Sequence, residues 1–307
     1  MTKTIAFLGL GHMGGPMAAN LVRAGYAVTG YDIMPAAVEA AAGNGITVAA
    51  SGIDTVAGAD VVITMFQSGK DVIDAYTGGG DGRDGLLDVA RPGTLFIDSS
   101  TIAVDEARAA HQLAVNAGHR HIDAPVSGGV VGAENATLAF MVGGPAEDFE
   151  NARPILEHMG KRIVHCGESG LGQAAKVCNN LILAVSQIAV AEAFVLGERL
   201  GLTDQTLFDV ASNASGQCWA LTTNCPVPGP VPTSPANRDY EPGFASALMA
   251  KDLGLAEQAL ASTGVRAPMG TLASEIYHDF ASGEGARKDF SAIITVIRAQ
   301  SAEGETA

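Results

Sequence analysis

The chain has 307 residues, more than one hydrophobic core usually serves, so we expect two domains. Hydrophobic residues make up 47% of it and charged residues only 17%, which leaves little room for disorder. The formal net charge of −15 argues against binding to nucleic acid, because that needs a surplus of lysine and arginine.

Compartment and membrane association are also indicated by the sequence. The four cysteines show no CxxC spacing, which favours buried thiols in a reducing compartment over a disulfide or a zinc site. The N-terminus runs directly into an expected strand and leaves no room for a signal peptide, so we expect a cytoplasmic protein. Polar residues interrupt the most apolar stretch, residues 181–197, and therefore predict a buried helix instead of a membrane span.

Strand and helix patterns alternate in the first half of the chain. Short β-rich runs are expected at residues 4–8, 27–31, 61–65, 95–98, 119–123 and 139–142. Amphipathic segments such as 13–24 and 34–42 lie between them, which predicts a parallel, doubly wound α/β sheet of the Rossmann type. His119 and His121 alternate on one run without a third ligand, so an ordinary edge strand is favoured over a metal site.

The second half of the chain has a different pattern, typical of helices. Strand patterns nearly vanish after residue 164, and a long apolar helix is expected from about residue 172 to 200. An irregular, proline-rich insertion follows at 225–242. We therefore predict a dinucleotide-binding domain over residues 1–164 and an all-α C-terminal domain for substrate binding and dimerisation over 165–307.

A glycine-rich turn follows the first expected strand. Gly9, Gly11 and Gly14 form the pattern GxGxxG between that strand and a helical segment. In this setting the glycines allow a tight turn, close approach of a pyrophosphate and close packing of the helix on the strand. We therefore predict a dinucleotide site here.

Asp32 ends the second expected strand, about 20 residues beyond the glycines, where an acidic side chain accepts hydrogen bonds from the adenosine ribose. Its charge would repel a 2′-phosphate, and neither Ile33 nor Met34 offsets it. The sequence thus favours NAD over NADP, with capping of the next helix as the alternative role for Asp32.

Three loops at the carboxyl ends of later strands are expected to line the cofactor crevice: 66–68, 99–101 and the loop at Ser127. The hydroxyl-rich loop 99–101 could instead be only a helix cap. Ser127 is followed by Gly128 and Gly129, so a hydroxyl and successive backbone N–H groups are left accessible. That combination suits the carboxylate of a small acid.

Lys176 and Asn180 lie four positions apart in the long helix and so share one face. An amine beside an amide suits a substrate hydroxyl, which needs a proton acceptor and an orienting donor. A lysine titrates at about 10.4 in water, so it acts as a base near neutrality only when its surroundings lower its pKa. From spacing alone, a surface ion-pair lysine remains the alternative.

At this point the chain resembles the 3-hydroxyisobutyrate dehydrogenases of the β-hydroxyacid dehydrogenase family over nearly its whole length. The resemblance rests on FLGLGHMGGPM at 7–17, DSSTI at 98–102, DAPVSGGVVGA at 123–133, GQAAKVCNN at 172–180 and KDLGL at 251–255. The segment NCPVPGPVPTSPAN at 224–237 resembles the 3-hydroxyisobutyrate branch in particular.

The resemblance implies a role for each matching residue. Lys176 is then the acid/base, Asn180 orients the substrate, and Ser127 with the N–H groups of Gly128 and Gly129 holds its carboxylate. The implied cofactor contacts are Gly9, Gly11, His12, Met13, Gly14, Asp32, Phe66, Gln67, Thr101 and Lys251. Two departures stand out: His12 replaces a more usual asparagine, and Asp71 adds a charge where relatives often have asparagine.

We therefore expect NAD-dependent oxidation of 3-hydroxyisobutyrate to methylmalonate semialdehyde, with no metal, by a homodimer or homotetramer. Reduction of a related semialdehyde, such as tartronate or succinate semialdehyde, is the alternative within enzymes. A non-catalytic NAD-binding sensor would require the pair of Lys176 and Asn180 to be incidental.

Overall fold

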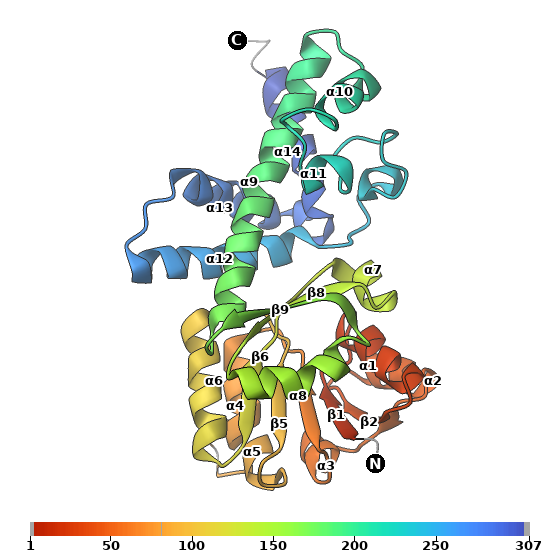
Figure 1. The fold of residues 1–307 in the computed structure, drawn as a ribbon. Coiled ribbons are helices and arrows are strands. Elements are labelled where there is room, and N and C mark those ends of the chain that lie inside the picture. The colour runs from red at the N-terminus through yellow and green to blue at the C-terminus, as the bar shows by residue number, and fades with distance from the viewer. Residues whose placement is uncertain (1–2, 81, 304–307) are drawn as a thin grey trace. The chain divides into compact units, whose positions relative to one another are not determined.

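The computed structural model describes residues 3–80 and 82–303. Contacts divide the chain into two compact units, Met1–Lys176 and Val177–Ala307. The sequence-based boundary at residue 164 falls inside a strand, since β9 (Gly160–Gly167) pairs with the neighbouring strand β8. The helices and strands are labelled in Figure 1.

The first unit is built on one sheet, in which the described residues form nine strands in the order β3-β2-β1-β4-β5-β6-β8-β7, with β9 paired to β8. The remaining strands are β1 (Thr4–Leu8), β2 (Ala27–Tyr31), β3 (Thr47–Val48), β4 (Val61–Thr64), β5 (Leu95–Asp98), β6 (Arg120–Asp123), β7 (Val126–Ser127) and β8 (Leu138–Gly143). Pairing is parallel from β3 to β6, so the carboxyl ends of these strands share one edge.

Helices cover both faces of the sheet because strand side chains alternate between them. Ile5 and Phe7 of β1 belong to one buried cluster, together with α1 (Gly14–Arg23) and α8 (Ala146–Leu156). Ala6 and Leu8 belong to the opposite cluster, with α4 (Gly69–Thr77) and α6 (Val104–Asn116), which lie side by side in Figure 1. The other helices of this unit are α2 (Pro35–Gly43), α3 (Gly52–Val56), η1 (Gly78–Gly80), α5 (Leu86–Val89) and α7 (Gly129–Glu134).

The sheet differs from the sequence prediction in two respects. It is mixed and not wholly parallel, because β8 runs antiparallel to both β6 and β7. The strand that carries His121 is also not an edge strand, since β6 lies between β5 and β8. His121 is fully buried there, and neither of its ring nitrogens has a hydrogen-bond partner among the described residues. Burial lowers the pKa of His121 to about 3, with the nearby His111 adding to the effect.

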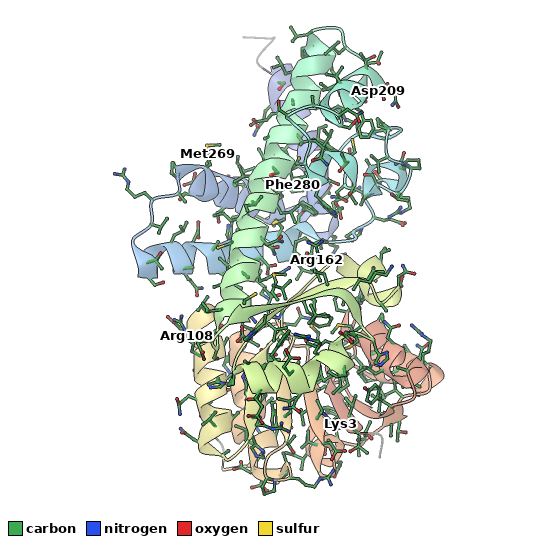
Figure 2. All side chains as sticks on the ribbon, in the orientation of Figure 1. Lys3, Arg108, Arg162, Asp209, Met269 and Phe280 are labelled. Carbon is green, nitrogen blue, oxygen red and sulfur yellow. The ribbon has the colours of Figure 1, made fainter. Side chains whose placement is uncertain are left out.

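The second unit is helical in the residues described, as the sequence predicts. It contains most of α9 (Leu171–Arg199), then α10 (Asp204–Ala211), α11 (Trp219–Thr222), η2 (Pro235–Arg238), α12 (Ser246–Thr263), α13 (Pro268–Ala281), η3 (Glu284–Arg287), η4 (Phe290–Ala292) and α14 (Ile293–Glu303). Its core includes Phe194 of α9, Met249 and Leu253 of α12, and Tyr277 of α13. Charged side chains such as Asp209 lie outside it, at the surface (Figure 2).

The proline-rich insertion is held in place by its own polar groups. The Tyr240 hydroxyl donates to the Pro226 carbonyl, and the Ser234 hydroxyl donates to the Cys225 carbonyl. The buried carboxylate of Asp289 accepts from the Asn224 amide and from the backbone N–H of Phe244. These bonds satisfy polar groups that a buried loop would otherwise leave unpaired.

Helix α9 is long and apolar enough, by length and composition, to cross a membrane. That criterion is weak evidence, because the core helix of a soluble protein also meets it. Residues Ala184, Ile188, Ala191, Phe194 and Val195 of α9 are buried in the core of the second unit. A row of exposed small and apolar residues runs along the other side, at Cys178, Ile182, Ala189, Ala193 and Leu196.

Candidate active site

The glycine turn after β1 has the geometry that a dinucleotide requires. A side chain on Gly9, whose φ is +90°, would collide with the Met65 carbonyl, and one on Gly14 would collide with the Gly9 carbonyl. A Cβ on Gly11 would meet nothing within 4 Å, so the protein itself gives no reason for that glycine. The backbone N–H groups of Gly11, His12 and Met13 have no acceptor among the described residues. A pyrophosphate fits this turn, because it brings oxygens to N–H groups at a helix N-terminus.

Asp32 follows β2 and is half-buried beside this turn. Its Oδ2 accepts a hydrogen bond of 2.7 Å from the Leu10 N–H, and its Oδ1 accepts one of 2.8 Å from the Met34 N–H. Each carboxylate oxygen has a further lone pair available for a hydroxyl donor. The bond to Leu10 ties the acidic side chain to the glycine turn. Asp32 does not cap α2, because the N-cap of that helix is Met34 and it has no side-chain cap hydrogen bond.

The loops after β4 and β5 are joined by a buried hydrogen-bond chain. The Ser100 hydroxyl donates to Asp98 Oδ1 over 2.6 Å and accepts from the Phe66 N–H over 2.8 Å. Asp98 Oδ1 also accepts from the Thr64 hydroxyl. Burial raises the pKa of Asp98 to about 6, although the hydroxyl donors oppose that rise. This chain fixes Phe66 relative to the loop that carries Thr101, while Gln67 is exposed.

The loop at Ser127 has the predicted accessible donors. Ser127 ends β7 opposite Ala139 of β8, and Gly128 and Gly129 follow with φ of +133° and +63°. These left-handed conformations favour glycine. Among the described residues, the Ser127 hydroxyl and the N–H groups of both glycines have no hydrogen-bond partner. An anionic substrate group would satisfy these donors.

Lys176 lies near the start of α9 and is buried, with 7% of its surface exposed. The start of that helix is fixed by Asp123 at the end of β6. Asp123 Oδ1 accepts from the Gly170 N–H over 2.7 Å, and the same carboxylate takes a second backbone donor one turn before the lysine. Burial raises the pKa of Asp123, and the backbone donors oppose the rise. A side chain on Gly172 would collide with Asp123 and with the Met141 carbonyl, so helix and sheet meet closely here.

Asn180 belongs to the second unit and is held by a residue that the sequence analysis did not single out. Its Nδ2 donates to Asp252 Oδ2 over 2.6 Å, and its Oδ1 accepts from the Asn179 amide. Asp252 is 5% exposed and lies 4.0 Å from the Lys251 ammonium through its other oxygen. The expected cofactor contact and the expected orienting amide are thus connected through one carboxylate. In the sequence, the only indication of Asp252 was its place in the KDLGL segment at 251–255.

Asp71, the residue that departs from the family pattern, is hydrogen-bonded to Ser68, the residue that caps its helix. The Ser68 hydroxyl donates to Asp71 Oδ2 over 2.7 Å and accepts from the Asp71 N–H at the start of α4. The carboxylate is therefore occupied locally. No group of three or more potential metal ligands occurs within the described residues.

Two protein-family models together match nearly the whole chain. The NAD-binding domain of 6-phosphogluconate dehydrogenase matches residues 4–167. A model described as the NAD-binding domain of NADP-dependent 3-hydroxyisobutyrate dehydrogenase matches residues 170–297. Gly9, Asp32 and Ser127 thus lie within the first match, and Lys176 and Lys251 within the second.

Several relatives are similar over their full length. A probable 3-hydroxyisobutyrate dehydrogenase of Mycobacterium bovis is 59% identical over 97% of this chain and 98% of its own. An NAD-dependent L-serine dehydrogenase of Pseudomonas aeruginosa is 47% identical over 95% of this chain and 96% of its own. The solved structure of a Mycobacterium tuberculosis 3-hydroxyisobutyrate dehydrogenase with L-serine is 58% identical and superposes with a TM-score of 0.91, covering 97% of this chain and 100% of that one. This chain belongs to the 3-hydroxyisobutyrate dehydrogenase family.

Proposed function

We propose that the protein oxidises 3-hydroxyisobutyrate to methylmalonate semialdehyde with NAD. The observation that carries this proposal is the combination, within the first unit, of a dinucleotide turn, unpaired donors at Ser127–Gly129 and the buried Lys176. Family membership and the names of the most similar relatives support the same substrate.

In this reaction each residue has a distinct task. Ser127 and the N–H groups of Gly128 and Gly129 bind the carboxylate and so fix the distance to the hydroxymethyl carbon. Lys176, which is buried, accepts the hydroxyl proton. Asn180, held by Asp252, orients the hydroxyl. Bound NAD supplies a hydride acceptor at its nicotinamide C4.

The experiment is a turnover assay with a panel of β-hydroxy acids and semialdehydes, each with NAD and with NADP. We expect the highest kcat/KM for 3-hydroxyisobutyrate with NAD. Lys176→Ala should lose several orders of magnitude in kcat while NAD still binds. Lys176→Arg should not restore turnover, because a guanidinium stays protonated. Activity near the unmodified level in either variant would contradict the role of Lys176.

L-Serine is a second candidate substrate, favoured by the names of two similar proteins. It shares the carboxylate and the hydroxymethyl group of 3-hydroxyisobutyrate and differs in bearing an ammonium in place of a methyl. The donors at Ser127–Gly129 do not separate the two, since both present the same carboxylate. The ratio of the two kcat/KM values in the panel decides between them.

We also infer a homodimer or homotetramer. The support is the row of exposed small and apolar residues on α9, from Cys178 to Leu196, which recurs at steps of three, four and seven positions. Such spacing places the residues on one helical face, and exposed apolar faces of this kind commonly pack against another copy.

A further inference from the structure

Gln173 is fully buried on α9, one helical turn before Lys176. A buried amide must find hydrogen-bond partners, and this one finds them in the loop after β5. Its Nε2 donates to the Ser100 carbonyl over 2.7 Å, and its Oε1 accepts from the Ile102 N–H over 3.2 Å. The two partners are the backbone groups on either side of Thr101, so one side chain holds both flanks of that residue.

The backbone of Gln173 is fixed as well. Its N–H donates to Asp123 Oδ2 over 3.0 Å, while the Gly170 N–H donates to the other oxygen of the same carboxylate. Asp123 belongs to β6, which is paired in register with β5, the strand that leads into the Thr101 loop. The amide of Gln173 therefore reaches Thr101 from a helix turn that is itself anchored to the sheet.

We propose that Gln173 is a positioning residue that sets the location of Thr101 relative to Lys176. The inference rests on the proposed function, in which Lys176 takes the substrate proton, and on the cofactor contact that the family resemblance implies for Thr101. Hydride transfer depends steeply on the distance between the reacting carbons, so the loss of this clamp slows the chemical step. It leaves most of the binding free energy intact, because the glycine turn, Asp32 and Ser127 are held by other contacts.

Two variants separate positioning from simple structural support. Gln173→Met keeps a long side chain but removes both hydrogen bonds, whereas Gln173→Glu keeps the acceptor for Ile102 and, when ionised, loses the donor to Ser100. We expect kcat to fall by about 10- to 100-fold in Gln173→Met and by less in Gln173→Glu. The KM values for acid and for NAD should change less than about threefold, and the primary deuterium isotope effect on kcat should rise because hydride transfer becomes more rate-limiting.

Thr94→Val is the matched control, since Thr94 is also buried in the first unit and its hydroxyl donates to the Arg91 carbonyl at the opposite end of β5. It should lower the melting temperature without altering kcat or the isotope effect. Unmodified kcat in Gln173→Met, or a loss of kcat with an unchanged isotope effect, would overturn the inference. If Gln173→Met does not fold, Gln173→Glu decides by the same two measurements.

Lys176→Ala is assayed in parallel to keep the two proposals apart. Retained turnover in Lys176→Ala would contradict both the proposed function and the inference about Gln173. Loss of turnover in Lys176→Ala together with full activity in the Gln173 variants would contradict only the inference about Gln173.

Discussion

Asp32 accepts hydrogen bonds from the Leu10 and Met34 N–H groups, and we propose that the same carboxylate also binds the adenosine ribose. Replacing Asp32 by serine and Ile33 by arginine removes a negative charge and adds a partner for a 2′-phosphate. We expect the ratio of kcat/KM for NADP over NAD to rise at least about tenfold, because one charge-assisted contact contributes about 1.5–3 kcal/mol.

Ile33→Arg alone is the control for the cofactor variant. It adds the cation while Asp32 still repels the phosphate, so its shift should be smaller. An unmodified protein that prefers NADP would show that Asp32 does not set the preference.

Ser127 is expected to recognise the substrate carboxylate. The compound 2-methyl-1,3-propanediol keeps the hydroxymethyl carbon and replaces the carboxylate with a second alcohol. Its kcat/KM should be lower by the equivalent of about 2–4 kcal/mol, because the aligned donors lose a charged partner. Ser127→Ala should cost more on the acid than on the diol. Equal losses on both compounds would exclude carboxylate recognition by this loop.

At the scale of elements, strand β6 contains a buried histidine that lowers the free energy of unfolding at acidic pH. The folded pKa of His121, about 3, lies below its ordinary value of 6.5, so the unfolded chain binds the proton first. The contribution of His121 is therefore fully present above pH 6.5 and is lost as pH falls towards 3. Between pH 7 and 5 the loss is about 2 kcal/mol of the free energy of unfolding.

His121→Phe should therefore be more stable than the unmodified protein at pH 7, by about 1–2 kcal/mol, because no unpaired ring nitrogen remains. Its advantage should widen by about 2 kcal/mol at pH 5. Urea denaturation of both proteins at pH 7 and pH 5 measures the difference in their free energies of unfolding. Burial raises the folded pKa of Asp98 to about 6, so its contribution to the free energy of unfolding increases as the pH falls from 7 to 5. This contribution is the same in both proteins and cancels from their difference.

His119→Phe is the matched control on the same segment. His119 Nε2 lies 2.9 Å from the Leu87 carbonyl, so its replacement breaks a buried hydrogen bond and should destabilise the protein. A constant stability difference between His121→Phe and the unmodified protein from pH 7 to pH 5 would contradict the buried, neutral state of His121.

Local patterns predicted the elements that carry the cofactor turn. The runs at 4–8, 27–31 and 95–98 coincide with β1, β2 and β5, because short apolar runs and flanking glycines determine them locally. The two-residue strands β3 and β7 lack enough sequence for such a pattern. Strand β9 was not predicted because charged residues and glycines leave it only a short apolar run at Ile163 and Val164. The antiparallel direction of β8 depends on long-range pairing.

The same distinction applies to the candidate site. Lys176, Asn180 and the Ser127 loop were noticed because their spacing or composition is unusual within a few residues. Gln173 and Asp252 were not, since their partners lie more than 70 residues away in the chain. A buried polar side chain acquires its role from the fold, and the sequence shows only that it sits in an apolar helix.

At the scale of the whole molecule, the row on α9 provides a test of assembly. Ile182→Glu combined with Leu196→Glu places two charges on side chains that are 68% and 61% exposed. We expect these changes to dissociate an oligomer, because burial of an unpaired charge is unfavourable. Light scattering coupled to gel filtration measures the mass. Val115→Glu, an exposed site on α6, should leave the mass unchanged, and a monomeric unmodified protein would refute the assembly.

Helix α9 also determines how this gene could be recombined with that of a relative. The contact boundary lies between Lys176 and Val177, inside the helix, so a crossover placed there would take the lysine from one parent and Asn180 from the other. It would also separate the helix turn that carries Gln173 from the rest of α9. With a junction at residues 167–169, ahead of Gly170, the whole helix comes from a single parent. The backbone N–H groups that donate to Asp123 then come from that parent too. Hybrid enzymes that exchange the helical half should therefore be spliced before the helix begins.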